Sequence, residues 1–274
     1  IADADLGTTG SQAAIKGITA FASINAALAA VSSSGTIIVN GGTYAESATL
    51  SGTESLRVTG ANSPQTVIIN SLIAAAGQNI QINGSSNLTI GDPTDSTIGS
   101  VISGSGSLTK QGSGKLTLSG TAANTFTGLT SVNAGTLELG KSANLNAIGG
   151  SLVIGDGSGT DSVKLLNAQQ IPDNQNVTVA SSGFWDLNGN VEYINVLNGS
   201  GLIDNTAAGT VEFRIGRDGG SGTWGGTIQN TGGALTLVKE GSIFSFTGTN
   251  TYTGGTLVSS VILILNNSGG NALS

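Results

Sequence analysis

Short runs of alternating apolar and polar residues dominate the chain from residue 36 onward. In the run Val-Glu-Phe-Arg-Ile at 211–215 the period of two is typical of a strand with one side on a core and the other in water. Such runs recur between Gly, Asn, Ser and Asp turns without helical segments between them, which leaves a sandwich, a barrel or a β-solenoid. The predicted strands include 56–58, 67–69, 80–82, 88–90, 116–118, 137–139, 152–154, 177–179, 211–215 and 235–237.

One stretch near the beginning of the chain has the helical period instead. Between residues 12 and 31, large apolar side chains recur at spacings of three and four, which places them on one face of a helix. Ser-Ser-Ser-Gly at 32–35 ends this pattern. We therefore expect a helix over 12–31, followed by a buried strand at 36–40.

An internal repeat decides among the three β architectures. Leu-Thr-Lys-Gln-Gly-Ser at 108–113 returns as Leu-Val-Lys-Glu-Gly-Ser at 237–242. Asn-Thr-Phe-Thr-Gly at 124–128 likewise returns as Asn-Thr-Tyr-Thr-Gly at 250–254. One supersecondary unit is thus used twice, with small changes in loop length. This behaviour favours a solenoid, because its strands pair with the turns above and below while the loops between them vary.

Two parts of the chain resemble known families. Residues 23–46 resemble the capping helix and first coil of the pectin-lyase-like right-handed parallel β-helix. Residues 106–137, and a second copy at 222–265, resemble the autotransporter-associated β-strand repeat of exported bacterial passenger domains.

The resemblance implies an all-β chain that folds as a right-handed parallel β-helix, a solenoid with an N-terminal capping helix. We expect a helical cap in 1–35 and a β-helix body in 36–274, with repeat copies near 104–140 and 222–265. At about 20 to 25 residues per turn, this body makes about ten to twelve turns. In the stacked turns we expect inward side chains at Leu116, Leu118, Leu137, Leu139, Val211, Phe213 and Ile215.

Composition removes much of enzyme chemistry. The chain has no Cys and no His, so disulfides, zinc–thiolate sites and imidazole bases are excluded. Nine Lys and Arg against sixteen Asp and Glu give a net charge of -7, and aromatic residues make up 4%, so we expect no nucleic-acid partner. No apolar run is long enough to span a bilayer as a helix. The chain begins at Ile1 without Met or a leader, which suits a mature protein, secreted or on the bacterial cell surface, or an excised fragment.

The acidic residues form no evident catalytic pair. Glycoside hydrolysis needs two carboxyl groups facing one bond, whereas the carboxylates here are scattered through turns, so we expect no enzyme activity and no cofactor. Asp156 and Asp161, in a glycine-rich stretch, are a calcium candidate, and a solvated turn is the competing interpretation.

A second candidate site combines aromatic and charged residues. An exposed Trp beside Arg and Asp is typical of a sugar-binding face. The competing interpretation is that the Trp side chains cover loops around a core that Phe213 fills. The candidate ligand-binding residues are Trp185, Asp186, Arg214, Arg217 and Trp224.

The most apolar run of the chain lies near its end. In Val261, Ile262, Leu263, Ile264 and Leu265 the alternation is lost, so at least two of these side chains leave the core in either register. We interpret this run as a self-association surface or as a strand that another segment covers. We therefore expect a non-catalytic exported protein with a structural or adhesive role, whose partner is itself or a surface glycan. The alternatives are a polysaccharide-binding or polysaccharide-cleaving β-helix enzyme and a subunit of an extracellular fibre or sheath.

Overall fold

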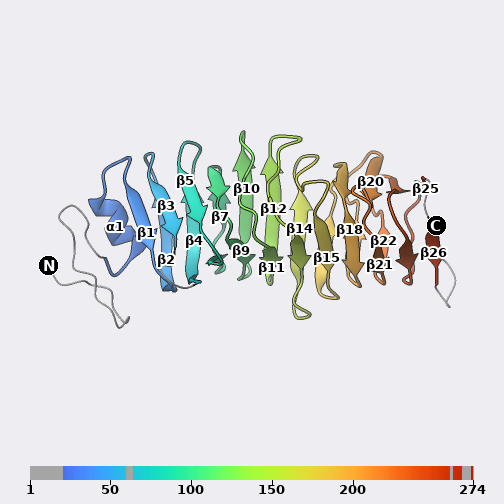
Figure 1. Cartoon of the computed structure of the whole chain (residues 1–274), viewed down its shortest axis with the longest axis horizontal. Helices are drawn as coiled ribbons and strands as arrows, with labels where there is room; N and C mark the ends of the chain where they lie inside the picture. Colours follow the sequence, from blue (N-terminus) through green and yellow to red (C-terminus); the bar gives the residue numbers. More distant parts are fainter. Residues whose placement is uncertain (1–20, 60–63, 260–261, 267–272, 274) are drawn as a thin grey trace.

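The chain folds into an elongated stack of parallel strands (Figure 1), seen here in a computed structural model that describes residues 21–59, 64–259, 262–266 and 273. It is a parallel β-solenoid of about ten turns with one short helix, α1 (Ile24–Ala30). α1 lies at one end of the rod and the last strand at the other (Figure 1). The expectation of a parallel solenoid is therefore confirmed, and the sandwich and barrel are excluded.

Each turn of the solenoid contributes to three faces. Strands pair only with the turns before and after them, and all the strand pairs in the described part of the chain are parallel. Two long strands, β2 (Gly42–Leu50) and β4 (Thr66–Ala74), run around the corner between the second and third faces. The first face contains β1 (Thr36–Val39), β3 (Ser55–Val58), β5 (Asn79–Ile82), β8 (Val101–Ser103), β17 (Glu192–Ile194), β20 (Val211–Ile215), β23 (Leu235–Lys239) and β25 (Thr256–Val258).

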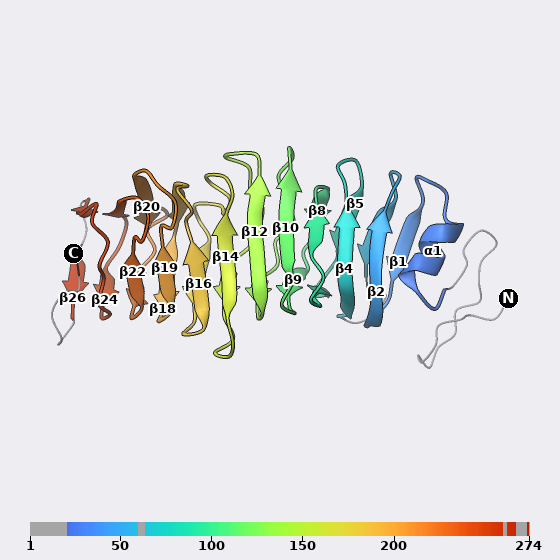
Figure 2. The ribbon, with the colours of Figure 1, turned by 180° about the vertical axis from the view of Figure 1, so that it is seen from behind.

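The other two faces are stacked without interruption, and Figure 2 shows β10, β12, β14 and β16 side by side. The second face contains β6 (Asn87–Ile90), β9 (Ser107–Lys110), β11 (Thr130–Val132), β13 (Leu152–Ile154), β15 (Asn176–Val179), β18 (Val196–Gly199), β21 (Gly222–Trp224), β24 (Phe244–Phe246) and β26 (Leu263–Leu265). The third face contains β7 (Ser96–Ile98), β10 (Lys115–Gly120), β12 (Gly135–Lys141), β14 (Asp161–Leu165), β16 (Gly183–Asp186), β19 (Leu202–Asp204) and β22 (Thr227–Gln229).

The first face continues between β8 and β17 without strand geometry. Thr125 N donates to Ile102 O at 2.8 Å, Asn124 N to Asn146 O at 2.9 Å, and Ala147 N to Gln170 O at 2.8 Å. These backbone hydrogen bonds carry the stack across the middle turns, so the interior is closed on all three sides.

The core is a set of side-chain columns that run along the rod. Leu116 stacks on Leu137 and Leu118 on Leu139 in register, and Val211, Phe213 and Ile215 alternate inward from β20. All seven residues expected to point inward are fully buried. Their neighbours Thr117, Glu138, Glu212 and Arg214 remain partly exposed, as an alternating strand requires.

The N-terminal cap is a shorter helix than its periodicity predicts. α1 begins at Ile24 because the hydroxyl of Ser23 accepts a hydrogen bond from Ala26 N at 3.0 Å and caps the helix. The Glu46 carboxylate, from β2, also accepts from Ile24 N at 2.6 Å and from Asn25 N at 3.0 Å. The expected helix is therefore wrong at 21–23 and at Val31, which is extended, and residues 12–20 lie outside the described part. Ile24 and Ala27 are buried against the first turn.

Candidate functional site

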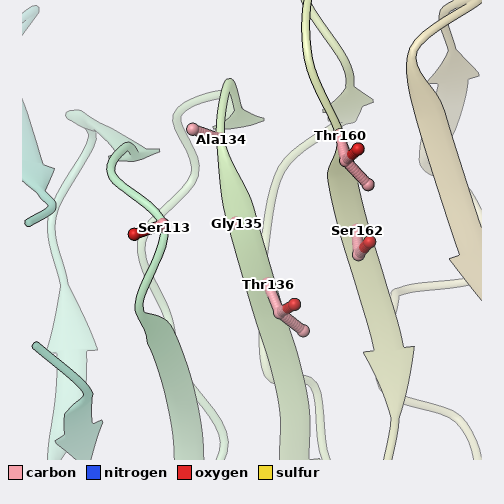
Figure 3. A pocket seen from close by; sticks show the side chains of 6 residues that line it. All are labelled: Ser113, Ala134, Gly135, Thr136, Thr160 and Ser162. Atoms are coloured by element: carbon pink, nitrogen blue, oxygen red, sulfur yellow. The ribbon is translucent and has the colours of Figure 1, made fainter. Parts of the chain in front are cut away.

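A shallow groove crosses three successive turns beside the third face. Its volume is about 410 Å³, and Figure 3 shows the side chains that line it. Thr136 of β12 stacks on Ser162 of β14, and Gly135 lies between Ala134 and Thr136. Its side-chain polar groups are the hydroxyls of Ser and Thr, and none of the lining side chains is acidic or basic. The lining residues are Ser113, Ala134, Gly135, Thr136, Thr160 and Ser162.

The two tryptophans lie inside the solenoid. Trp185 and Trp224 are both 0% exposed, and the Trp185 ring meets that of Phe213 edge to face with centroids 5.3 Å apart. Trp224 is paired with Gly199 of the preceding turn. Its indole lies close to Gly226, where a Cβ would come within 2.6 Å of the ring. The expectation of an exposed Trp on a sugar-binding face is therefore wrong. The competing interpretation, in which the two Trp side chains cover loops, is also wrong, because both side chains fill the core.

The charged members of that candidate site form ion pairs with other residues of this chain. Asp186 is almost fully buried, where Thr206 Oγ1 donates to its carboxylate at 2.8 Å and Lys164 Nζ lies 3.4 Å away. Arg214 and Arg217 lie on the outside of the first face, with their guanidinium carbons 5.0 and 5.2 Å from the centroid of the Tyr193 ring.

Acidic residues neutralise both of these arginines. Arg214 donates to Glu212 Oε1 and, at 2.6 Å, to Glu240 Oε1, while Arg217 donates to Asp173 Oδ2 at 3.3 Å. The hydrogen bond to Glu212 raises the pKa of the Arg214 guanidinium further above its ordinary value. This cluster links three turns, and both of its guanidinium groups are already paired with carboxylates of this chain.

The two residues of the calcium candidate have different surroundings. Asp161 is fully buried and its Oδ2 accepts from Ser182 Oγ at 2.6 Å, whereas Asp156 is exposed and accepts from Ser158 N of its own turn at 2.9 Å. Within the described residues, no three acidic side chains are grouped so that they could hold a metal ion. Asp156 therefore behaves as a turn residue.

Each copy of the internal repeat buries a lysine at an inward position. Lys110 stands between Ile90 and Val132 in its core column, and Lys239 stands between Ile215 and Val258. The alternation of Leu108, Thr109 and Lys110 placed the lysine in phase with the core, which is the signal that could have revealed it.

Backbone carbonyls, not carboxylates, hold these ammonium groups. Lys110 Nζ donates to Gln111 O, to Gly112 O at 2.7 Å and to Ala134 O of the next turn at 3.2 Å. Lys239 Nζ donates to Glu240 O. Burial lowers the pKa of Lys110 to about 8, although Asp95 and Asp92 act in the opposite direction. The lysine therefore ties two successive turns together at a corner.

The repeated asparagine bridges turns in the same way. Asn124 Oδ1 accepts from Ile102 N at 2.9 Å and its Nδ2 donates to Ala147 O at 2.7 Å, so one buried side chain links three turns. In the second copy, Asn250 Oδ1 accepts from Ile228 N at 2.8 Å. The shared geometry explains why these residue types recur in order.

Both copies match the passenger-associated-transport-repeat. The matched residues are 108–139 and 232–260. No curated protein and no solved structure matches the chain. Together with the solenoid, this repeat is consistent with a β-helix of the autotransporter passenger type, and it points to an exported or surface-displayed protein.

The two passenger-associated repeats occupy different positions around the rod. In the first copy the lysine strand is β9 on the second face, and in the second copy it is β23 on the first face. Asn124 accordingly stacks on β8 of the first face, and Asn250 stacks on β22 of the third. The second copy is therefore displaced by one face, so the repeat does not depend on which side of the solenoid it occupies.

The C-terminal end of the described solenoid is strongly apolar. Leu263 and Leu265 stack in register on Phe244 and Phe246, while Ile264 points outward beside Ser245. Ile262 is 60% exposed, Ile264 43% and Leu265 52%, and no further turn covers them within the described residues. Val261 lies outside the described part. At the corresponding place in the first repeat copy, β11 and β12 are covered, because β13 and β14 of the next turn pair with them.

The burial of two further ionisable side chains escaped the sequence analysis. Lys141 is fully buried and donates to Ser100 O at 2.8 Å, and burial lowers its pKa to about 8. Glu192 is fully buried, accepts from Gln170 N at 2.8 Å, and has its pKa raised to about 8 by burial. No helix among the described residues is long and apolar enough to cross a membrane.

Proposed function

We propose that this chain is a non-catalytic, surface-displayed β-solenoid with a structural or adhesive role, and that it associates with itself through its C-terminal end. The observation that carries the proposal is an uninterrupted stack of parallel turns that holds two passenger-associated repeats and ends in exposed Ile262, Ile264 and Leu265. The interior is filled by side chains along its described length, and the outer grooves are shallow and lined mainly by hydroxyl groups and glycine.

Self-association is supported by the cost of the exposed isoleucines. Large aliphatic side chains gain about 1.5 to 3 kcal/mol when they leave water, so a partner that covers them is favoured.

The proposal is tested with the double variant I262T/I264T, which gives the last turn the hydroxyl character of earlier turns. Sedimentation velocity from nanomolar to high micromolar concentration should show weaker self-association, with an unchanged circular dichroism spectrum. The matched control is I38T/I73T, because Ile38 and Ile73 are also exposed but lie in the first turns. A wild-type protein that stays monomeric over this range would overturn the self-association.

The non-catalytic role has its own test. Purified protein should release no product from pectin, alginate or peptidoglycan. Cleavage that disappears when Asp156, Asp186 or Asp218 is changed to Asn would contradict the proposal.

A further inference from the structure

The second face of the rod differs from the other two in its charge. Lys110, which points inward, is the only charged residue in the nine strands from β6 to β26 that form it. By contrast, Glu212 and Arg214 point outward from the first face, and Glu138 and Lys164 from the third. The chain carries a net charge of -7, so two copies that approach each other meet least repulsion where this face is turned to its counterpart.

The outward side chains of this face are small and stacked in register. One column runs from the second-face strand β6 to β26, one residue per turn, and is uncharged throughout. Most of its members are Ser or Thr, and the last is isoleucine. The column begins at Thr89, which is itself buried, and continues with Thr109, Ser131, Val153, Thr178, Asn198, Thr223, Ser245 and Ile264.

The same face ends in an apolar ridge. Ile243 directly precedes β24 and is 48% exposed, and Phe244 N donates to Ile262 O at 3.1 Å, so Ile243 and Ile262 are neighbours on successive turns. With Ile264 they form the ridge. Beside it lies a shallow hollow of about 410 Å³, lined by Asn198, Ser221, Gly222, Thr223, Ile243 and Ser245.

A further turn stacked on β26 would cover Leu263 and Leu265, which point along the core columns. It would leave the ridge exposed, because Ile243, Ile262 and Ile264 point sideways from the rod. A partner that buries the ridge must therefore lie beside the rod and not beyond its end.

We propose that the second face is a lateral interface, on which a second copy of this chain packs face to face with the two rods parallel. A two-fold axis along the rod brings each turn opposite the same turn of the partner, so that the ridge meets the partner's ridge and the hydroxyl columns meet each other. Stacked sheets pack in this aligned way. Rods displayed from one surface point in one direction, which this arrangement requires. The inference rests on the proposed self-association and specifies its surface.

The size of the face sets the strength of this contact. The eight strands from β9 to β26, about 4.8 Å apart, give a length of about 34 Å, and two outward columns give roughly 450 Å² per copy. A stable dimer buries about 800 Å² per partner, so the pair is transient in solution. Many rods held on one surface reinforce such a contact through their high local concentration.

The absence of cysteine makes the interface directly testable, since each introduced thiol is unique in the chain. The variant V153C carries its thiol on the second face, and S162C carries it on the third face of the same turn. At high micromolar concentration, a short bismaleimide should link V153C into dimers at least ten times faster than S162C. The variant T178K, which places a like charge in both copies, should abolish linking of V153C.

Orientation is tested by mixing isotope-labelled T109C with unlabelled S245C, which lie near opposite ends of the face. Parallel rods give like-with-like products only, whereas a mixed T109C–S245C product would overturn the arrangement. If the wild type self-associates but V153C links no faster than S162C, this inference is wrong, while the proposed self-association of the chain stands. If the wild type is monomeric at every concentration, both fail.

Discussion

Replacing Asn124 by alanine should destabilise the middle turns more than its small volume suggests. The side chain is almost fully buried, accepts from Ile102 N and donates to Ala147 O. Alanine leaves both backbone groups buried without a partner, and each such group costs about 1 to 3 kcal/mol. The expected loss in the free energy of unfolding is therefore about 2 to 6 kcal/mol for N124A.

Urea unfolding measured by circular dichroism checks the magnitude, and amide hydrogen exchange checks the location. A solenoid is stabilised locally by contacts between neighbouring turns, so exchange should accelerate around Ile102 and much less in the last turns. The matched control is N176A, because Asn176 is exposed and its side chain accepts only one hydrogen bond, at 3.4 Å. Its free energy of unfolding should change by no more than about 0.5 kcal/mol. Equal unfolding midpoints for N124A and N176A, with unchanged exchange at Ile102, would refute the bridging role.

Two other predictions concern the N-terminal cap and the pH dependence of the free energy of unfolding. Deleting residues 12–31 removes α1 from the first turn, so light scattering should show aggregation or dimerisation; a monomer that melts at the wild-type temperature would count against the cap. Because burial raises the pKa of Glu192 from 4.5 to about 8, the folded chain favours its protonated form. The free energy of unfolding should therefore fall by about 1.4 kcal/mol per pH unit as the pH rises from 4.5 toward 8. The variant E192Q should lose this slope in pH-dependent urea titrations, and an unchanged slope would contradict the assignment.

Strand positions were predictable because alternation is a local property of the sequence. The pattern of Val211, Phe213 and Ile215 against Glu212 and Arg214 fixes which side of β20 faces the core, and the structure confirms it. The repeat was predictable for a related reason, since its residue types recur in the same order along the chain. In both copies the lysine donates to the carbonyl of the next residue, and the asparagine accepts from a backbone N–H of the preceding turn.

The orientation of the tryptophans could not be predicted from the same pattern. Phe184 and Trp185 are adjacent large aromatic residues, so either could have faced inward. Trp185 does so because it enters a column between Val163 and Ile203 of the neighbouring turns. Which residue lies above or below depends on the number of residues in each turn, and this number varies along the chain. The candidate sugar-binding face depended on that missing information.

The one-face displacement between the two passenger-associated repeats has a consequence for length variation. The stretch from Lys110 to Lys239 does not make up a whole number of turns, so a further copy of such a stretch would rotate everything after it by one face around the rod axis. The direction in which a distal surface points is thus set by how many units precede it. Chains that gain or lose one unit would present the same distal residues toward a different neighbour, with no substitution in those residues. The number of repeat copies then determines the direction in which the distal surface points as well as the length of the rod.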